Sequence, residues 1–398
     1  MSIFPYSRQK ISSSDIKAVK QVLESELLTQ GPLVEKFEKK FSQFVNSKYS
    51  TAVNSATSAL YIACAALNFK KNDILWTSCN TFVSSANCGV HLGGKIDLLD
   101  IDYETGNIDV NLLEKKLQKA KKRNKLPKII IPVHFSGIPT EQDKIWNLSK
   151  KYKFKIIEDA SHSLGSKYKK NITGNCKWSH ITIFSLHPVK IITTAEGGVA
   201  TTNDKYLNIK MQMLKNSGIT KNKNSFINKK KSTLDWYYEQ QILGMNMRMN
   251  EISAALGLSQ LKNVKKFVVE RNKIARFYNK TLDTRFLLLP KVRKDFYSSF
   301  HLYLVKIKLK NYKYLQKKLF RELRKNNFFV QVHYLPVHQH PYYKKKFNLK
   351  DIHFSQAIKH SESSISIPIF PGLKYKTLSK ICNLINNFFK INQKSIYL

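Results

Sequence analysis

Short apolar runs alternate with amphipathic segments through the first two thirds of the chain. Residues 128–133 form an apolar, β-branched run typical of a buried strand, and residues 140–151 follow with the 3–4 spacing of a helix. The same patterns predict strands at 49–53, 96–100, 155–158, 180–185 and 198–202, and helices at 58–67 and 108–122. This alternation predicts a doubly wound, mostly parallel α/β sheet, which binds ligands at the carboxyl ends of its strands.

The pattern changes in the last third of the chain. Residues 250–282 carry apolar side chains at helical spacing, and a strand, helix, strand and helix are then predicted at 301–309, 312–326, 328–333 and 373–389. We therefore expect a large domain of residues 1–270 and a smaller C-terminal α/β domain of residues 271–398, with the N-terminal residues packing on the smaller one. Residues 216–231 are polar and rich in Lys and Asn, which predicts a surface loop that closes near the substrate.

The composition is that of a globular protein. The chain has 398 residues, of which 42% are hydrophobic, enough for a large core. No run approaches the roughly 20 apolar residues of a membrane span, and the first residues lack a signal-peptide pattern, so we expect a cytoplasmic protein without a membrane partner. The five cysteines are scattered without a Cys-x-x-Cys pair, and no His-x-x-x-His pattern occurs, so we predict neither disulfides nor a metal site.

The formal net charge of +41 raises the question whether the protein binds nucleic acid. A nucleic-acid-binding protein is one interpretation, but such proteins concentrate their charge on one face or tail. Here the lysines are spread over the whole chain. We expect no nucleic-acid partner, although the excess charge favours anionic, phosphorylated substrates.

Residues 184–198 hold a single lysine, Lys190, in an otherwise nearly uncharged run that closes with Glu196 and two glycines. A desolvated lysine has a lowered pKa and becomes a nucleophile toward carbonyls. The simpler interpretation is a lysine at a strand edge whose amine reaches water. The rest of the sequence decides between the two.

Three further motifs follow predicted strands. Asp159 ends the strand at 155–158, where a carboxylate points into the crevice above the sheet, although it is also a common helix cap. Ala56 and Thr57 open a helix, whose N-terminus binds phosphate, although Ser/Thr caps look the same. Phe82 lies among small polar residues, where an aromatic ring either stacks on a flat cofactor or joins the core. Together, an amine, an acid, a phosphate site and a ring platform are what pyridoxal phosphate requires.

Longer motifs extend this pattern over nearly the whole chain. They include Tyr6 and Ser7 with residues 28–32, and residues 132–139, 244–251 and 332–338. With them the chain resembles the DegT/DnrJ/EryC1/StrS family of fold-type-I sugar aminotransferases. Residues 161–168 and 193–198 make it most similar to the branch that acts in pseudaminic acid synthesis.

The resemblance implies a role for each matching residue. Lys190 matches the catalytic lysine that holds pyridoxal phosphate and moves a proton, and Asp159 matches the acid that keeps the pyridine nitrogen protonated. The other cofactor-binding residues implied are Ala56, Thr57 and Ser185 at the phosphate, Phe82 and His162 at the ring, and Asn246 at the phosphate of the partner subunit's cofactor. The active unit is therefore expected to be a homodimer with shared sites. The residues expected to face the sugar nucleotide are Tyr6, His187, Arg248, His333 and Tyr334, with a structural histidine as the alternative for His187.

The sequence departs from the family pattern at two positions. Phe82 replaces a Trp or Tyr of some relatives, a change that stacking tolerates. Ala195 stands where many relatives carry glycine, and an alanine with a positive φ would be strained. We interpret Ala195 as a mark of the branch and expect no such strain. Lys190 is retained where related dehydratases have histidine, which supports transamination.

The resemblance implies a specific reaction. L-glutamate donates its amino group to the cofactor, which passes it to the 4-keto carbon of a UDP-4-keto-6-deoxy-N-acetylhexosamine. The expected product is UDP-4-amino-4,6-dideoxy-N-acetyl-β-L-altrosamine. The alternatives are another nucleotide-sugar 4-aminotransferase, of the perosamine or bacillosamine type, and a non-catalytic regulator on the same fold.

Overall fold

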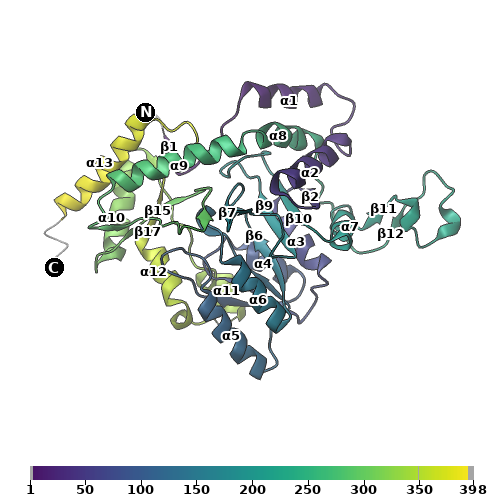
Figure 1. The fold of residues 1–398 in the computed structure, drawn as a ribbon, viewed down its shortest axis with the longest axis horizontal. Coiled ribbons are helices and arrows are strands. Elements are labelled where there is room, and N and C mark those ends of the chain that lie inside the picture. Colours follow the sequence, from purple (N-terminus) through teal and green to yellow (C-terminus); the bar gives the residue numbers. More distant parts are fainter. Residues whose placement is uncertain (1–2, 348, 393–398) are drawn as a thin grey trace.

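The computed structural model describes residues 3–347 and 349–392. A seven-stranded sheet lies at its centre (Figure 1), in the order β2-β10-β9-β6-β5-β3-β4. Its strands are β2 (Tyr49–Val53), β3 (Ile74–Ser78), β4 (Lys95–Leu99), β5 (Ile129–Ile131), β6 (Lys155–Asp159), β9 (Ile181–Ser185) and β10 (Gly198–Thr202). Neighbouring strands run parallel except at β10, which is antiparallel to β2 and β9. The predicted mostly parallel α/β sheet is confirmed, and β3 is a strand that the pattern missed.

Apolar side chains leave both faces of this sheet. Ile129 and Ile131 of β5 join one hydrophobic cluster, whereas Ile130 between them joins another, as expected for a strand buried on both sides. The helices over the first face are α3 (Ala56–Ala66), α4 (Ser84–His91) and α7 (Lys205–Leu214). Those over the second face are α2 (Pro32–Val45), α5 (Val110–Lys122), α6 (Gln142–Tyr152) and α8 (Glu251–Leu261).

A second, antiparallel sheet contains β13 (Leu287–Leu288), β15 (Tyr303–Ile307) and β17 (Ser364–Ile367). Its hydrophobic core begins at Ile274 and ends at Phe389. The helices around it are α9 (Val264–Thr281), α10 (Tyr312–Lys325), α12 (Ser355–Ser363) and α13 (Tyr375–Ile391). The predicted boundary after residue 270 lies inside α9. The N-terminal strand β1 (Phe4–Pro5) pairs in parallel with β16 (Phe328–Phe329), so the first residues are fixed to this part of the molecule.

Smaller elements complete the described chain. Helix α1 (Ser13–Leu23) packs on α8. In the sequence, α11 (Pro341–Phe347) comes between β15 and β17. A three-stranded sheet is formed by β14 (Phe296–Tyr297), β7 (Lys167–Tyr168) and β8 (Asn171–Ile172).

Residues 216–245, here called the arm, protrude from the body beyond α7 (Figure 1). The arm contains the antiparallel pair β11 (Ile219–Thr220) and β12 (Glu239–Gln240) and two short 3-10 turns, at Lys223–Ser225 and Lys229–Lys231. Large apolar side chains are exposed on it, including Ile227 (79%), Trp236 (75%) and Leu243 (87%). The predicted surface loop is therefore the first half of a longer projection with an apolar surface.

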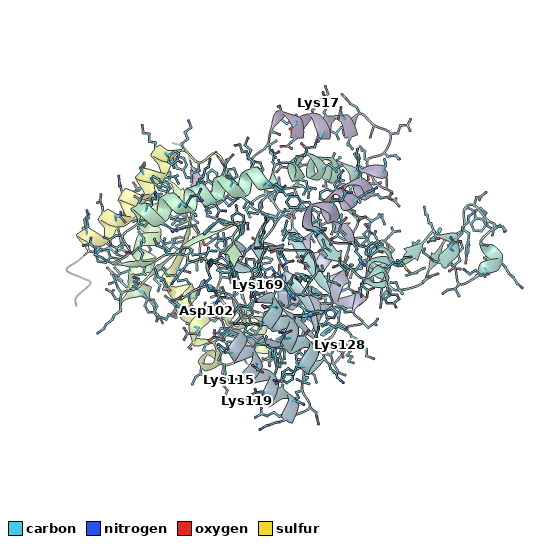
Figure 2. All side chains as sticks on the ribbon, in the orientation of Figure 1. Lys17, Asp102, Lys115, Lys119, Lys128 and Lys169 are labelled. Carbon is cyan, nitrogen blue, oxygen red and sulfur yellow. The ribbon has the colours of Figure 1, made fainter. Side chains whose placement is uncertain are left out.

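The positive charge is not confined to one element. The lysines labelled in Figure 2 include Lys17 on α1, Lys115 and Lys119 on α5, and Lys169 next to β7. None of the helices in residues 3–347 and 349–392 is long and apolar enough to cross a membrane. Within the same residues, His, Cys, Asp and Glu side chains do not gather in groups of three or more that could hold a metal ion.

Candidate active site

A pocket of about 410 Å³ lies where the carboxyl ends of the central strands meet the second sheet. Its walls come from the start of α3, the loop after β3, the ends of β6 and β9, and the segment before β10. Of the residues predicted to form the site, the structure brings these together in one pocket: Tyr6, Ala56, Thr57, Phe82, Asp159, His162, Ser185, His187, Lys190, His333 and Tyr334. They converge because parallel strands end at the same edge of a sheet.

Lys190 lies in the loop that joins β9 to β10. The loop is closed by hydrogen bonds from the Lys190 N–H to the His187 carbonyl (2.9 Å) and from the Thr194 N–H to the Leu186 carbonyl (3.0 Å). Burial lowers the pKa of the Lys190 amine to about 8, and the negative charge of Asp159 acts in the opposite direction. The amine is thus partly neutral, and therefore nucleophilic, at neutral pH.

Asp159 is buried at the end of β6, with its carboxylate held by two donors. The Ser85 hydroxyl donates to Oδ2 at 2.6 Å, and the backbone N–H of Ser161 donates to Oδ1 at 3.1 Å. The hydroxyl of Thr81 pairs with that of Ser85 at 2.8 Å. Ser85 is a site residue that was not predicted from the sequence, although two hydroxyl residues four apart, at the start of a helix after a strand, are the signal that could have indicated it.

The start of α3 forms one end of the pocket. Ser55 caps the helix by accepting the Ser58 N–H (3.1 Å), which leaves the amides of the first turn directed at the pocket. In the strand register, Gly198 lies opposite both Val53 and Ser185. A Cβ on Gly198 would lie 2.4 Å from the Ser55 carbonyl oxygen, so only glycine permits this approach.

The ring wall of the pocket is aromatic. Phe82 is 58% exposed, so it is not a core side chain and its ring is open to a ligand. His162 is buried, and its pKa is well below the ordinary value because of burial and the nearby Lys190 charge. The neutral ring accepts the Ser136 N–H at Nδ1 (3.3 Å), so Nε2 carries the proton and donates to the Tyr334 hydroxyl (3.1 Å). The phenolic proton of Tyr334 is then available to a group in the pocket.

Ala195 requires a correction. Its φ is 64°, in the left-handed region, so the expectation that it avoids a positive φ is wrong. The backbone N–H of Ala195 donates to the Thr193 hydroxyl at 2.9 Å, which holds the turn in this conformation. The side chain of an L-residue makes the left-handed region costly by about 1–2 kcal/mol. The turn that carries Lys190 back into β10 is therefore strained.

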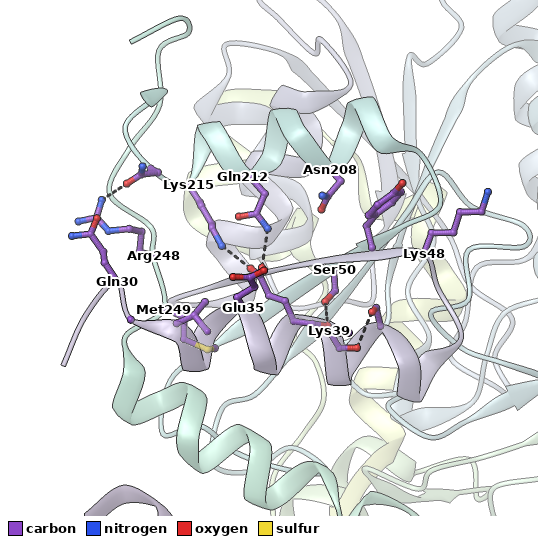
Figure 3. Close-up of a pocket in the computed structure, with 16 residues that line it drawn as sticks. Gln30, Glu35, Lys39, Lys48, Ser50, Asn208, Gln212, Lys215, Arg248 and Met249 are labelled. Atoms are coloured by element: carbon purple, nitrogen blue, oxygen red, sulfur yellow. Dashed lines mark hydrogen bonds and ion pairs between the residues drawn. The ribbon is translucent and has the colours of Figure 1, made fainter. Parts of the chain in front are cut away.

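Asn246 and Arg248 lie apart from the pocket of their own chain. Arg248 borders a different cavity of about 600 Å³ along α2 and α7 (Figure 3), and its guanidinium donates to the Asn216 side chain at 2.6 Å. Asn246 forms a backbone bridge with Asn216, and the Asn54 N–H donates to the Met247 carbonyl at 2.9 Å. These two residues are held rigidly at the edge of the sheet but do not complete the site of the same chain.

These features fit pyridoxal phosphate. The pocket holds a nucleophilic amine, a fixed carboxylate, a helix N-terminus with hydroxyls beside it, and an aromatic face left uncovered by the described chain.

Comparison with known proteins gives a consistent result. The sequence model of the DegT/DnrJ/EryC1/StrS aminotransferase family matches residues 9–386. The chain is 37% identical, over 93% of its length and 93% of the relative's, to a UDP-4-amino-4,6-dideoxy-N-acetyl-beta-L-altrosamine transaminase of Campylobacter jejuni. Helicobacter pylori PseC, an aminotransferase involved in the biosynthesis of pseudoaminic acid, superposes with a TM-score of 0.88 at 30% identity, over 98% of this chain and 100% of that one. The PLP form of the sugar aminotransferase Spr1654 of Streptococcus pneumoniae superposes with a TM-score of 0.87 at 25% identity, over 98% and 99%.

Proposed function

Because the chain belongs to the DegT/DnrJ/EryC1/StrS aminotransferase family, we propose that it transfers an amino group from L-glutamate to a UDP-4-keto-6-deoxy-N-acetylhexosamine. The product is UDP-4-amino-4,6-dideoxy-N-acetyl-β-L-altrosamine, the sugar named in the C. jejuni relative, for pseudaminic acid synthesis. The enzyme depends on pyridoxal phosphate. The observation that carries the proposal is the convergence of Lys190, Asp159 and the start of α3 in one pocket of a chain so similar to that relative.

The cofactor has a defined place among these residues. When bound, pyridoxal phosphate supplies an aldehyde that takes up the amino group and a ring that withdraws electrons from the bond being broken. Lys190 would hold this aldehyde through its amine, and the same amine, when free, would carry the proton between the amino carbon of the substrate and the aldehyde carbon of the cofactor. Asp159 would hold the proton on the ring nitrogen, and its two hydrogen bonds keep its carboxylate in place.

The remaining walls bind and orient. The amides of Ala56 and Thr57 and the Ser185 hydroxyl bind the phosphate, and Phe82 packs on the ring. The residues at the open side of the pocket contact the sugar nucleotide: Tyr6, His187, His333 and Tyr334. The net positive charge attracts the diphosphate of that substrate.

The proposal includes a homodimer with shared sites. Asn246 and Arg248 lie outside the pocket of their own chain, on a segment fixed to the end of β2, and in the dimer they reach the partner's pocket. The arm beside them exposes apolar side chains that a second copy would cover. It also includes a cytoplasmic location, because a substrate with two phosphates does not cross a membrane unaided.

The test is a direct assay. The purified protein, loaded with pyridoxal phosphate, is incubated with L-glutamate and the UDP-4-keto sugar, and the product is identified by NMR. The expected outcome is the 4-amino sugar of L-altro configuration, with no turnover by Lys190→Ala. Turnover of only a GDP-linked keto sugar, or of only the other C5 epimer, would favour the perosamine or bacillosamine type. A visible spectrum that glutamate leaves unchanged would favour the non-catalytic regulator.

A further inference from the structure

Arg271 on α9 is a fully buried cation outside the pocket. Its Nη1 donates to the carbonyl oxygens of Phe300 (3.2 Å), His301 (3.1 Å) and Ile369 (2.7 Å), and its Nη2 donates to the Ser7 hydroxyl (3.2 Å). All four acceptors are neutral oxygens, and burial lowers the pKa of Arg271 to about 9. A guanidinium buried in this way is unfavourable by itself, so what it holds in place requires an explanation.

Ser7 carries the connection from Arg271 to the loop of Lys190. The Ser7 side chain is buried, and while its hydroxyl accepts from Arg271 it donates to the Val189 carbonyl at 2.8 Å. That carbonyl belongs to the peptide bond between Val189 and Lys190. The N–H of the same peptide donates to the His187 carbonyl at 2.9 Å.

Both polar groups of this one peptide are therefore fixed. Because a peptide unit is planar, holding its carbonyl and its N–H fixes the orientation of this plane and with it the position of the Lys190 Cα, from which the side chain leaves the backbone. The N–H is held by the loop itself, whereas the carbonyl accepts, among the residues that the structure describes, from the hydroxyl of Ser7, a residue 182 positions earlier in the chain.

The segment that carries Ser7 is anchored to β16 and to the chain just after β17. The Tyr6 N–H donates to the Phe329 carbonyl (3.1 Å), and the Ile369 N–H donates to the Tyr6 carbonyl (2.9 Å). Arg271 binds the carbonyl of the same Ile369. A continuous set of hydrogen bonds thus connects β16 and the residues after β17 with the N-terminal segment and the peptide of the lysine loop.

We propose that Ser7 and Arg271 are positioning residues that orient Lys190 through the Val189 carbonyl. Arg271 fixes the Ser7 hydroxyl, and Ser7 fixes the peptide. Neither side chain reacts. This inference rests on the proposed role of Lys190, and the experiment separates the two.

The test compares Ser7→Ala with Tyr278→Phe. Tyr278 is a matched control because it lies on the same helix as Arg271, is fully buried, and donates its hydroxyl to a backbone carbonyl, that of Pro368, at 2.6 Å. Each substitution removes one buried hydroxyl, but only that of Ser7 touches the lysine loop. The first readout is the rate at which the protein stripped of cofactor binds added pyridoxal phosphate covalently, with the attachment trapped by borohydride and located by mass spectrometry. The second is steady-state kinetics, and the third is the melting temperature.

We expect both variants to melt at lower temperature than the wild type. Only Ser7→Ala should slow covalent capture and lower kcat, by about tenfold, because small misplacements of a reacting group are expensive. The KM for L-glutamate should stay within about twofold. Capture at the wild-type rate by Ser7→Ala, or equal slowing in both variants, would overturn the positioning role.

Two further outcomes are decisive. Failure of the wild-type protein to attach the cofactor at Lys190 would overturn the proposed function itself. If Ser7→Ala does not fold, Ser7→Cys replaces it, because a thiol is of similar size but is a weak donor, and the same comparison with Tyr278→Phe applies.

Discussion

The lowered pKa of Lys190 gives a quantitative prediction for the protein stripped of cofactor. With a pKa of about 8, roughly a tenth of the Lys190 amine is neutral at pH 7. An ordinary lysine, with a pKa near 10.4, is only about 0.04% neutral at that pH. Because the neutral amine is the nucleophile, Lys190 should react with pyridoxal phosphate roughly 250 times faster than an ordinary lysine for this reason alone.

The assay measures the rate of covalent attachment by stopped-flow absorbance between pH 6 and pH 10. A blocked lysine derivative, measured in parallel, is the reference, and the ratio of the two rates cancels the titration of the cofactor's own groups. For the protein, the rate should rise about tenfold per pH unit below pH 8 and level off above it. A protein profile that still rises in parallel with the reference through pH 9 to 10 would show that burial does not lower the pKa of Lys190.

The Asp159→Asn variant tests the origin of the shift. Burial lowers the pKa of Lys190, and the negative charge of Asp159 opposes this by stabilising the ammonium form. Without the charge of Asp159, only burial acts on the pKa of Lys190. The pH at which the rate of covalent attachment levels off should therefore be lower in the variant. Movement to higher pH would refute the assignment of opposing effects, whatever the effect of the variant on turnover.

Three other predictions follow from the site and its surroundings. Ser85→Ala removes a 2.6 Å hydrogen bond to the Asp159 carboxylate, a bond of about 1.5–3 kcal/mol, so kcat should fall roughly 10- to 100-fold in steady-state assays, and the melting temperature should fall as well. If the sites are shared between subunits, mixing inactive Lys190→Ala with inactive Asn246→Ala should restore up to about a quarter of wild-type activity after subunit exchange. The reason is that half of the dimers then contain one subunit of each variant, and one of the two sites in such a dimer is intact. If the sites are not shared, the mixture should stay inactive. Ala195→Gly relieves the left-handed strain and should raise the free energy of unfolding by about 1 kcal/mol in urea titrations, whereas a decrease would show that the turn is unstrained.

Local patterns predicted most of the sheet and most of the pocket. The β-branched run at 128–133 became β5, and residues placed after predicted strands converged because parallel strands end at one edge. β3 was missed because its apolar residues, Ile74 to Trp76, are few and are followed by Thr77 and Ser78. Such a short run lacks the period that distinguishes a strand from a loop.

The contacts that orient the loop of Lys190 could not be predicted from local sequence patterns. Ser7 and Arg271 are separated by 264 positions, and their pairing depends on how the N-terminal segment pairs with β16. The left-handed φ of Ala195 was not predictable because alanine, unlike glycine or asparagine, does not mark that conformation. Contacts between residues far apart in the sequence become visible only in the folded structure, whereas the ends of strands can be predicted from the local sequence pattern.

The close approach at Gly198 means that substitutions can change the shape of the pocket at one end but not at the other. Between the start of α3 and the end of β9 lies the backbone of Gly198, which has no side chain. No substitution of a side chain there can therefore change the distance between these two elements. The dimensions at this end are set by strand spacing, which is nearly the same in all sheets. Selection for a different sugar is therefore expected to act on the wall formed by Tyr6, His333 and Tyr334, where side chains and not bare backbone line the pocket.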